Sequence, residues 1–245
     1  MPSRAYPCFF VGSEKIEFFC VYLRLVMTKV ARIVAAIAVG FFIAGCAGSE
    51  NPEPEPIVYN FVTYESTATD GTESVFTYQV NGDSPLVTLT ANWRPAEPIS
   101  TGTRLLLSYI PESGTTESGP VSVQGYIVLP GGEVRVDEPE GESEPMRLNS
   151  MWRSGSYLNL DGVVSFGGPA SEISLYAEPG SEGSAEPRLN VIVRKSDEGS
   201  GMAAERRLYA SWDISSFWSR DDVGALIVAY TNTENETSIM RFIKQ

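Results

Sequence analysis

The residue that says most about the chemistry of this 245-residue chain is one that it lacks. The sequence contains no histidine, so the commonest general base and the commonest metal ligand of proteins are both missing. Ser-His-Asp and Cys-His arrangements are therefore excluded. The only thiols are those of Cys8, Cys20 and Cys46, and the sequence around Cys46 points to a specific chemistry.

Cys46 follows a short apolar segment. Residues 33–44 carry no charge, and the basic residues Lys29 and Arg32 precede them, which is the pattern of a secretory signal peptide. The run is shorter than the roughly 20 apolar residues that a membrane-spanning helix needs. A buried helix that contains a cysteine is the alternative interpretation.

The residues directly before the cysteine favour lipid attachment. They are Ile43, Ala44 and Gly45. This segment resembles the bacterial lipobox, in which the following cysteine is lipidated and becomes the mature N-terminus. We therefore expect residues 27–45 to be a lipoprotein signal peptide and Cys46 to anchor the protein to a membrane. Residues 1–26 match no secretory pattern, and we interpret them as a spurious upstream extension.

Removal of residues 1–45 changes the chemistry of what remains. Five basic and two acidic residues are lost, which leaves 13 basic and 29 acidic residues in 200, a net charge of −16. Such a charge opposes nucleic-acid binding, so we expect no nucleic-acid partner. Lipidation consumes the last thiol, and neither remaining lysine, Lys195 or Lys244, lies in an S-x-x-K motif. We predict a protein that is not an enzyme and needs no cofactor or metal.

Two alternatives remain open for the abundant carboxylates. Paired acids could support glycoside hydrolysis, although most acids here cluster in loops rich in proline and glycine. The acidic stretch at 137–145 could bind calcium, but it lacks the D-x-D-x-D-G pattern of a calcium loop. We interpret residues 138–145 as an acidic linker and the Pro-Glu repeat within 46–56 as an extended spacer of roughly 30 Å.

Between these breaks the sequence is rich in short, β-branched and aromatic runs. In the first half they are 57–64, 74–80, 86–90, 104–110, 121–129 and 133–136. In the second half they are 147–152, 156–166, 172–176, 188–194, 205–212, 225–231 and 238–243, with one short helix expected at 214–220. The pattern predicts an all-β protein. A small OB-like barrel at 57–137 and a β-sandwich at 146–245 fit the strand spacing, with 178–187 as a long hairpin loop. Periodicity alone does not separate the barrel from an open meander.

Several of these strands resemble those of a known family. The segments are Gly102–Tyr109, Met146–Trp152, Ser156–Leu160, Leu208–Ser215, Ala225–Tyr230 and Ser238–Phe242. In their order and spacing they resemble the strands of NigD-like lipoproteins of Bacteroidetes. The resemblance implies an N-terminal OB-like domain, a C-terminal β-sandwich and an envelope lipoprotein with a proposed role in bacteriocin immunity. It supplies no catalytic residues, and Trp212 stands where the family usually has phenylalanine.

The resemblance also bears on location and partner. The acids that follow Cys46 (Glu50, Glu53 and Glu55) resemble signals for export to the surface of the outer membrane. We expect an unknown protein or peptide partner, with a surface glycan of a polysaccharide-utilisation system as the alternative ligand. Candidate glycan platforms are Trp93, Trp212, Trp218 and, more weakly, Tyr176. Strand patterns place Trp152 and Trp212 in the core, which leaves Trp93 and Trp218 as candidate binding residues.

Replacing the anchoring cysteine tests the assignment of the N-terminal segment. In a Cys46→Ser protein the lipobox is followed by no thiol for lipid attachment, so we expect the protein to leave the membrane fraction. Cell fractionation followed by immunoblotting measures this redistribution. A Cys46→Ser protein that stays in the membrane fraction contradicts the assignment.

Overall fold

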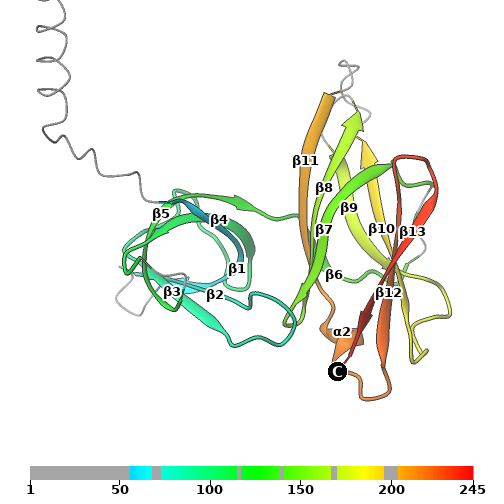
Figure 1. Cartoon of the computed structure of the whole chain (residues 1–245), viewed down its shortest axis with the longest axis horizontal. Helices are drawn as coiled ribbons and strands as arrows, with labels where there is room; N and C mark the ends of the chain where they lie inside the picture. The colour runs from blue at the N-terminus through cyan, green and yellow to red at the C-terminus, as the bar shows by residue number, and fades with distance from the viewer. Residues whose placement is uncertain are drawn as a thin grey trace, which may run out of the picture. The chain divides into compact units, whose positions relative to one another are not determined.

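The computed structural model describes residues 56–67, 73–114, 117–137, 139, 141–166, 170–195 and 204–244. All of them fall within one compact unit, Glu55–Gln245. The expected all-β class is confirmed, because this part of the chain forms a closed five-stranded barrel followed by two four-stranded sheets (Figure 1).

The barrel contains the first five strands. They are β1 (Val58–Thr67), β2 (Ser74–Tyr78), β3 (Val87–Ala91), β4 (Arg104–Pro111) and β5 (Gly119–Val128). Their order is β1-β2-β3-β5-β4, and pairing of β1 with β4 closes the barrel. All neighbours are antiparallel except β3 and β5, which are parallel. The first five strands therefore form the small closed barrel expected from the sequence, and not an open meander.

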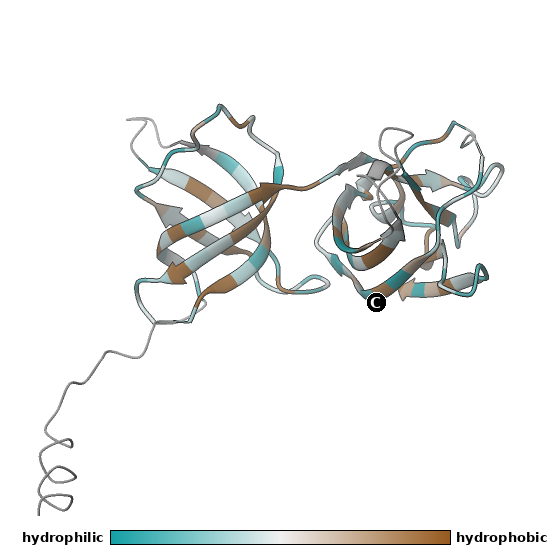
Figure 2. Cartoon of the chain, turned by 90° about the horizontal axis from the view of Figure 1, so that it is seen from above, coloured by the Kyte–Doolittle hydropathy of each residue, from teal (hydrophilic) through white to brown (hydrophobic). Residues whose placement is uncertain are grey.

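Alternation along each strand fills the barrel interior. On β4, Leu105, Leu107 and Tyr109 are fully buried and point inward, whereas the residues between them point outward. This two-residue period is what a strand with one buried face requires, and it appears as bands of hydropathy along the strands in Figure 2. In the long β3–β4 connection, Trp93 and Ile99 pack against the same core.

The second half forms two sheets that enclose one core. The strands are β6 (Gly131–Glu133), β7 (Met146–Ser154), β8 (Tyr157–Phe166), β9 (Ala170–Ala177), β10 (Arg188–Lys195), β11 (Ala204–Asp213), β12 (Ala225–Thr231) and β13 (Thr237–Ile243). One sheet has the order β13-β12-β10-β9 and the other β6-β11-β8-β7. Buried side chains from both sheets make up a single hydrophobic cluster around Trp212. This arrangement is a β-sandwich.

Three local details refine the sequence prediction. The sixth strand is Gly131–Glu133 rather than 133–136, and it pairs in parallel with β11. The short helix, α2, is confined to Ser215–Trp218. The loop at 178–187 joins the antiparallel strands β9 and β10 and is therefore the hairpin loop that the sequence predicts.

Gly131 allows β6 to lie against β11. A Cβ atom at this position would lie 1.7 Å from the carbonyl oxygen of Ser211, which is far inside van der Waals contact. The parallel pairing of the two strands therefore depends on a residue without a side chain.

A Gly131→Ala substitution should destabilise the sandwich, because the strands must separate to admit the methyl group. We expect a loss of about 3 kcal/mol, at the upper end of the cost of overpacking, measured by chemical denaturation. Gly224→Ala is the matched control, since a Cβ atom at Gly224 would have no atom within 4 Å of it. Equal stability of the two variants would contradict the interpretation.

Candidate functional site: a cleft beside the barrel

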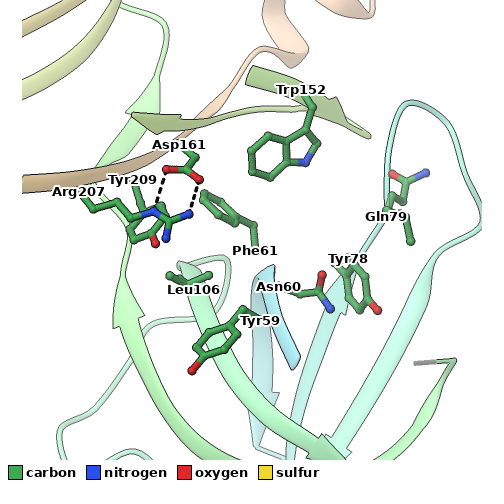
Figure 3. Close-up of a pocket in the computed structure, with 11 residues that line it drawn as sticks. Tyr59, Asn60, Phe61, Tyr78, Gln79, Leu106, Trp152, Asp161, Arg207 and Tyr209 are labelled. Atoms are coloured by element: carbon green, nitrogen blue, oxygen red, sulfur yellow. Dashed lines mark hydrogen bonds and ion pairs between the residues drawn. The ribbon is translucent and has the colours of Figure 1, made fainter. Parts of the chain in front are cut away.

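A cleft of about 610 Å³ lies where the outer face of the barrel meets the sheet β6-β11-β8-β7. Its walls carry residues from β1, β2, β4, β7, β8 and β11. The lining residues are Tyr59, Asn60, Phe61, Tyr78, Gln79, Val80, Leu106, Trp152, Asp161, Arg207 and Tyr209 (Figure 3). Aromatic and apolar side chains predominate, with a few hydrogen-bonding groups among them.

Phe61 contacts the aromatic residues of the opposite wall. Its ring lies 4.9 Å from the ring of Trp152, at 77°, and 6.0 Å from the ring of Tyr209, at 74°. Such edge-to-face contacts are the favoured geometry for aromatic pairs. Phe61 is only 9% exposed, and in Figure 3 it lies between the other two side chains. The three rings therefore make an apolar floor rather than a flat, open platform.

The barrel wall extends this floor outward. In the β1–β4–β5 register, Phe61 is opposite Leu106, and Leu106 is opposite Ile127. Exposure rises along this row to 54% at Ile127, and the neighbouring Tyr59 is 63% exposed. An apolar row thus leads from the buried floor to solvent.

The sandwich wall supplies the polar groups. The Asp161 carboxylate accepts hydrogen bonds from Nε and Nη2 of Arg207, at 3.1 and 2.7 Å, and from the Asn149 amide at 3.1 Å. The Arg207 hydrogen bonds are the main reason why the pKa of Asp161 lies below its usual value. The guanidinium also lies 5.1 Å from the centre of the Tyr209 ring. The Arg207 side chain is 59% exposed, so it offers a hydrogen-bond donor at the rim.

Arg104 joins the two walls behind the cleft. This β4 side chain is 7% exposed. It donates to Thr63 in the barrel at 2.9 Å, and to Asn159 and Ser211 in the sandwich at 3.0 Å each. Its guanidinium also lies 4.1 Å from the centre of the Tyr157 ring. Barrel and sandwich are therefore connected through one side chain.

The charge of Arg104 is held without an acidic partner among the described residues. Burial removes water from the guanidinium and lowers its pKa to about 10. Three neutral oxygen acceptors and the face of an aromatic ring replace part of that hydration. The group remains protonated at neutral pH, and its hydrogen-bonding geometry fixes how the two β-structures meet.

A second contact lies at the other end of the cleft. The two-residue turn between β7 and β8 has Gly155 at a φ of 59°, and its amide donates to the Gly82 carbonyl at 2.8 Å. Arg153 makes a bidentate pair with Asp83 of the barrel, at 2.8 and 2.6 Å, and its guanidinium lies 4.3 Å from the centre of the Trp218 ring. The barrel is thus attached to the sandwich at two separated places.

The candidate glycan platforms named from the sequence do not line this cleft. Trp218 is 9% exposed, and the Arg153 guanidinium covers its ring. Trp93 is half-buried and packs against Phe76 and Tyr126 of the barrel. Trp212 is fully buried, as its strand pattern predicts, and Tyr176, the weaker candidate platform, is buried as well. Trp152, which the strand pattern also places in the core, is instead half-buried and lines the cleft. Trp212, Trp218 and Tyr176 are thus too deeply buried to offer an open ring face on which a sugar could stack.

Sequence reasoning missed the residues that the fold brings together. Tyr59, Asp161, Arg207 and Tyr209 lie on three strands that are far apart in the sequence. One signal was present: outward positions of these strands carry aromatic residues where small polar ones are usual.

The lipobox residues and Cys46 lie outside the described residues. Among those described, no group of three or more potential ligands is placed to hold a metal ion, and no helix is long and apolar enough to cross a membrane.

No family model and no curated protein matches this sequence. Solved structures do share its fold. A protein of unknown function from Bacteroides vulgatus matches with a TM-score of 0.56 at 14% identity, over 78% of this chain and 92% of the other. A NigD-like immunity protein from Bacteroides caccae matches with a TM-score of 0.52 at 15% identity, over 78% and 99% of the two chains.

The chain has the fold of a NigD-like protein. The resemblance drawn from the order of the strands is thereby confirmed at the level of the fold. A candidate lipoprotein from Bacteroides fragilis shares it too, with a TM-score of 0.53 at 9% identity, over 78% of this chain and 99% of that one. In this NigD-like fold the cleft lies between the two β-structures, and its shape depends on how Arg104 holds them together.

Replacing Arg104 tests this dependence. Arg104→Met keeps most of the side-chain volume but removes the hydrogen bonds that the guanidinium donates to the buried Thr63, Asn159 and Ser211. Asn159 keeps only the hydrogen bond from the Ser211 hydroxyl among those its Oδ1 accepts. We expect a loss of about 3 kcal/mol in the free energy of unfolding, measured by chemical denaturation. Arg206→Met, at an exposed arginine, should change stability by less than about 0.5 kcal/mol. If Arg104→Met is as stable as the unmodified protein, the connection is not what holds the walls together.

Proposed function

We propose that this protein is a non-catalytic, lipid-anchored protein of the bacterial envelope that binds a segment of a protein or peptide partner in the cleft. The observation that carries the proposal is the cleft itself. An apolar floor formed around Phe61 is bordered by the hydrogen-bonding groups of Arg207 and Asp161. Such a combination suits an apolar side chain inserted into the floor while its backbone meets the polar rim.

The composition of the chain supports a binding role over catalysis. It has no histidine, and among the described residues Asp161 is the one acid that lines the cleft, whereas a glycosidase needs two carboxylates. That acid is already engaged by Arg207 and Asn149. A carboxylate held in its ionised form by two donors is a poor general acid.

The comparisons support an envelope location and an immunity-type role. Two of the proteins that share the fold are described as a NigD-like immunity protein and a candidate lipoprotein. The lipobox at Cys46 and the acids after it suggest an outer-membrane anchor with the β-structures facing the cell surface. From that position the protein would intercept a bacteriocin-type polypeptide before the polypeptide reaches its target.

Glycan binding is the second candidate. Tyr59 favours it, because this residue is 63% exposed and lines a cleft that also contains Arg207. Sugars commonly bind by stacking on an aromatic face beside such hydrogen-bonding groups. The edge-to-face packing of Phe61 with Trp152 and Tyr209 weighs against it, because it leaves no extended flat surface for a sugar chain.

A complementation assay tests the proposed role. A deletion strain should be more sensitive to any bacteriocin that the same locus encodes, and the unmodified gene should restore resistance. Leu106→Asp places a charge in the cleft, so it should fail to restore resistance. Leu86→Asp, at a leucine that is 60% exposed outside the cleft, should restore it. The immunity role is excluded if the deletion strain is no more sensitive than its parent.

A glycan array with the same variants separates the two candidates. Binding of a polysaccharide that is lost in Tyr59→Ala and retained in Leu86→Asp would favour the glycan ligand over the polypeptide. Trp93→Ala and Trp218→Ala should not abolish such binding selectively, because both rings pack against other side chains.

A further inference from the structure

The edges of the two sandwich sheets differ sharply in how they are protected. A sheet edge exposes unpaired backbone groups that invite pairing with another chain, and proteins usually shorten, bend or cover such edges. The four edge strands here are β6 and β7 of one sheet and β9 and β13 of the other. Three of them carry a recognisable protection.

Strands β6, β7 and β9 are each protected against pairing with another chain by a structural feature of their own. Strand β6 has only three residues. The pairing of β7 shifts register between Leu148 and Ser150, and its end is bridged by Gly82 of the barrel. Along β9, the backbone of Arg135 donates to the Leu175 carbonyl at 2.8 Å and accepts from the Ala177 amide at 2.7 Å. Each of these edges is therefore short, irregular or already paired over part of its length.

Strand β13 has none of these protections. It runs for seven residues, Thr237–Ile243, in unbroken register with β12, and it contains no proline. No described strand pairs with its other side (red in Figure 1). Its outward-facing residues include Ile239 and Ile243, which are 56% and 62% exposed. The edge is therefore long and regular, and two of its four outward side chains are apolar.

The ladder shows which backbone groups face the open side. The Lys244 amide donates to the Gly224 carbonyl at 2.8 Å, and the Glu236 carbonyl accepts from the Asn232 amide at 2.9 Å. Hydrogen-bonded pairs alternate along an antiparallel ladder, so even-numbered residues of β13 bond to β12. The N–H and C=O groups of Thr237, Ile239, Arg241 and Ile243 therefore point to the open edge.

We propose that β13 is a docking edge for an extended strand of a partner protein, separate from the cleft. Only a polypeptide backbone supplies alternating donors and acceptors that match the open row. The partner residues that pair with Ile239, Arg241 and Ile243 lie on the same face, two positions apart. The partner strand should therefore carry apolar–x–acidic–x–apolar side chains and no proline in its centre.

Charge favours an acidic residue at the centre of that strand. Residues 237–243 contain Arg241 and no acid, although the chain as a whole has a net charge of −13. Arg241 contacts Glu186 at 2.5 Å, and both side chains are nearly half exposed. A partner carboxylate can therefore share or replace this contact, which is worth little at the surface.

A second copy of this chain fits the edge less well. In a symmetric pairing centred on Met240, Ile239 would be opposite Arg241 of the other copy, and a pairing centred on Arg241 would place two arginines opposite each other. The strongly negative net charge of each copy adds repulsion. A short segment of another protein can pair with the same edge without the unfavourable placement of arginine and without the repulsion between two negative chains.

A preorganised peptide tests the proposal on the full chain purified in detergent. The probe is a cyclic β-hairpin whose outer strand reads Ile-Thr-Glu-Thr-Ile, with affinity measured by fluorescence anisotropy. Ile239→Pro removes an outward N–H but no bond to β12, so it should weaken binding about tenfold or more without lowering the unfolding midpoint. Ile239→Thr keeps that N–H and is the matched control, which should bind more tightly than the proline variant.

A charge reversal distinguishes strand pairing from non-specific adhesion. Arg241→Glu should prefer the hairpin that carries lysine in place of the central glutamate, whereas the unmodified chain prefers glutamate.

The proposal is overturned if neither hairpin binds, or if Ile239→Pro binds as well as Ile239→Thr. Sedimentation that shows a dimer lost in Ile239→Pro would instead assign the edge to self-association. Leu106→Asp leaves β13 intact and should not change hairpin binding, so failure of the cleft function and failure of the edge are separable.

Discussion

The structure depends on a buried guanidinium that has no acidic partner among the described residues. Arg104 lies on a barrel strand, yet two of its three hydrogen-bond acceptors, Asn159 and Ser211, belong to the sandwich. Burial of a cation is costly, which is why its pKa is lowered to about 10. The cost is offset only while all the acceptors and the Tyr157 ring stay in place. The orientation of barrel and sandwich is therefore held within narrow limits, and so is the cleft between them.

A cleft made in this way has two chemically different walls. The barrel contributes an apolar row on its outer face, and the sandwich contributes aromatic rings together with Arg207 and Asp161. Neither wall alone is a site: each is the outer face of a β-structure whose own core lies on the other side. The bidentate pair of Arg153 with Asp83 steadies the far end. Ligand binding at such a place is sensitive to any change in how the two β-structures meet.

The sandwich protects most of its edges with contacts that also hold the fold together. Arg135 covers β9, the barrel covers the end of β7, and β6 is too short to recruit a strand. Protection of three edges makes the open edge of β13 informative, because exposed backbone is a liability unless it is used. The protein would then have two separate surfaces for polypeptides, one that accepts side chains in a cleft and one that pairs with backbone.

The sequence by itself determined the class and order of the elements. Alternating apolar residues, as in 104–110, fix a strand and its buried face through local geometry, so the strands agree closely with prediction. The one strand that was misplaced, β6, depends on Gly131 fitting against Ser211, a non-local contact that leaves no periodic signal. The absence of histidine is likewise a property of the sequence alone, and it limits the available chemistry whatever the fold.

Only the tertiary structure decided where the candidate sites lie. Trp218 stands in irregular sequence, yet the fold buries it beneath Arg153. Tyr59 and Tyr209 are ordinary strand residues until pairing of β1 with β4 and of β11 with β8 brings their outer faces to one cleft. Side-chain direction follows from local alternation, whereas the neighbour that a side chain meets follows from sheet order and from the contact at Arg104. Sheet order and the contact at Arg104 are set by packing between segments far apart in the sequence, as Arg104 and Ser211 are, at 107 residues. No local pattern encodes such packing.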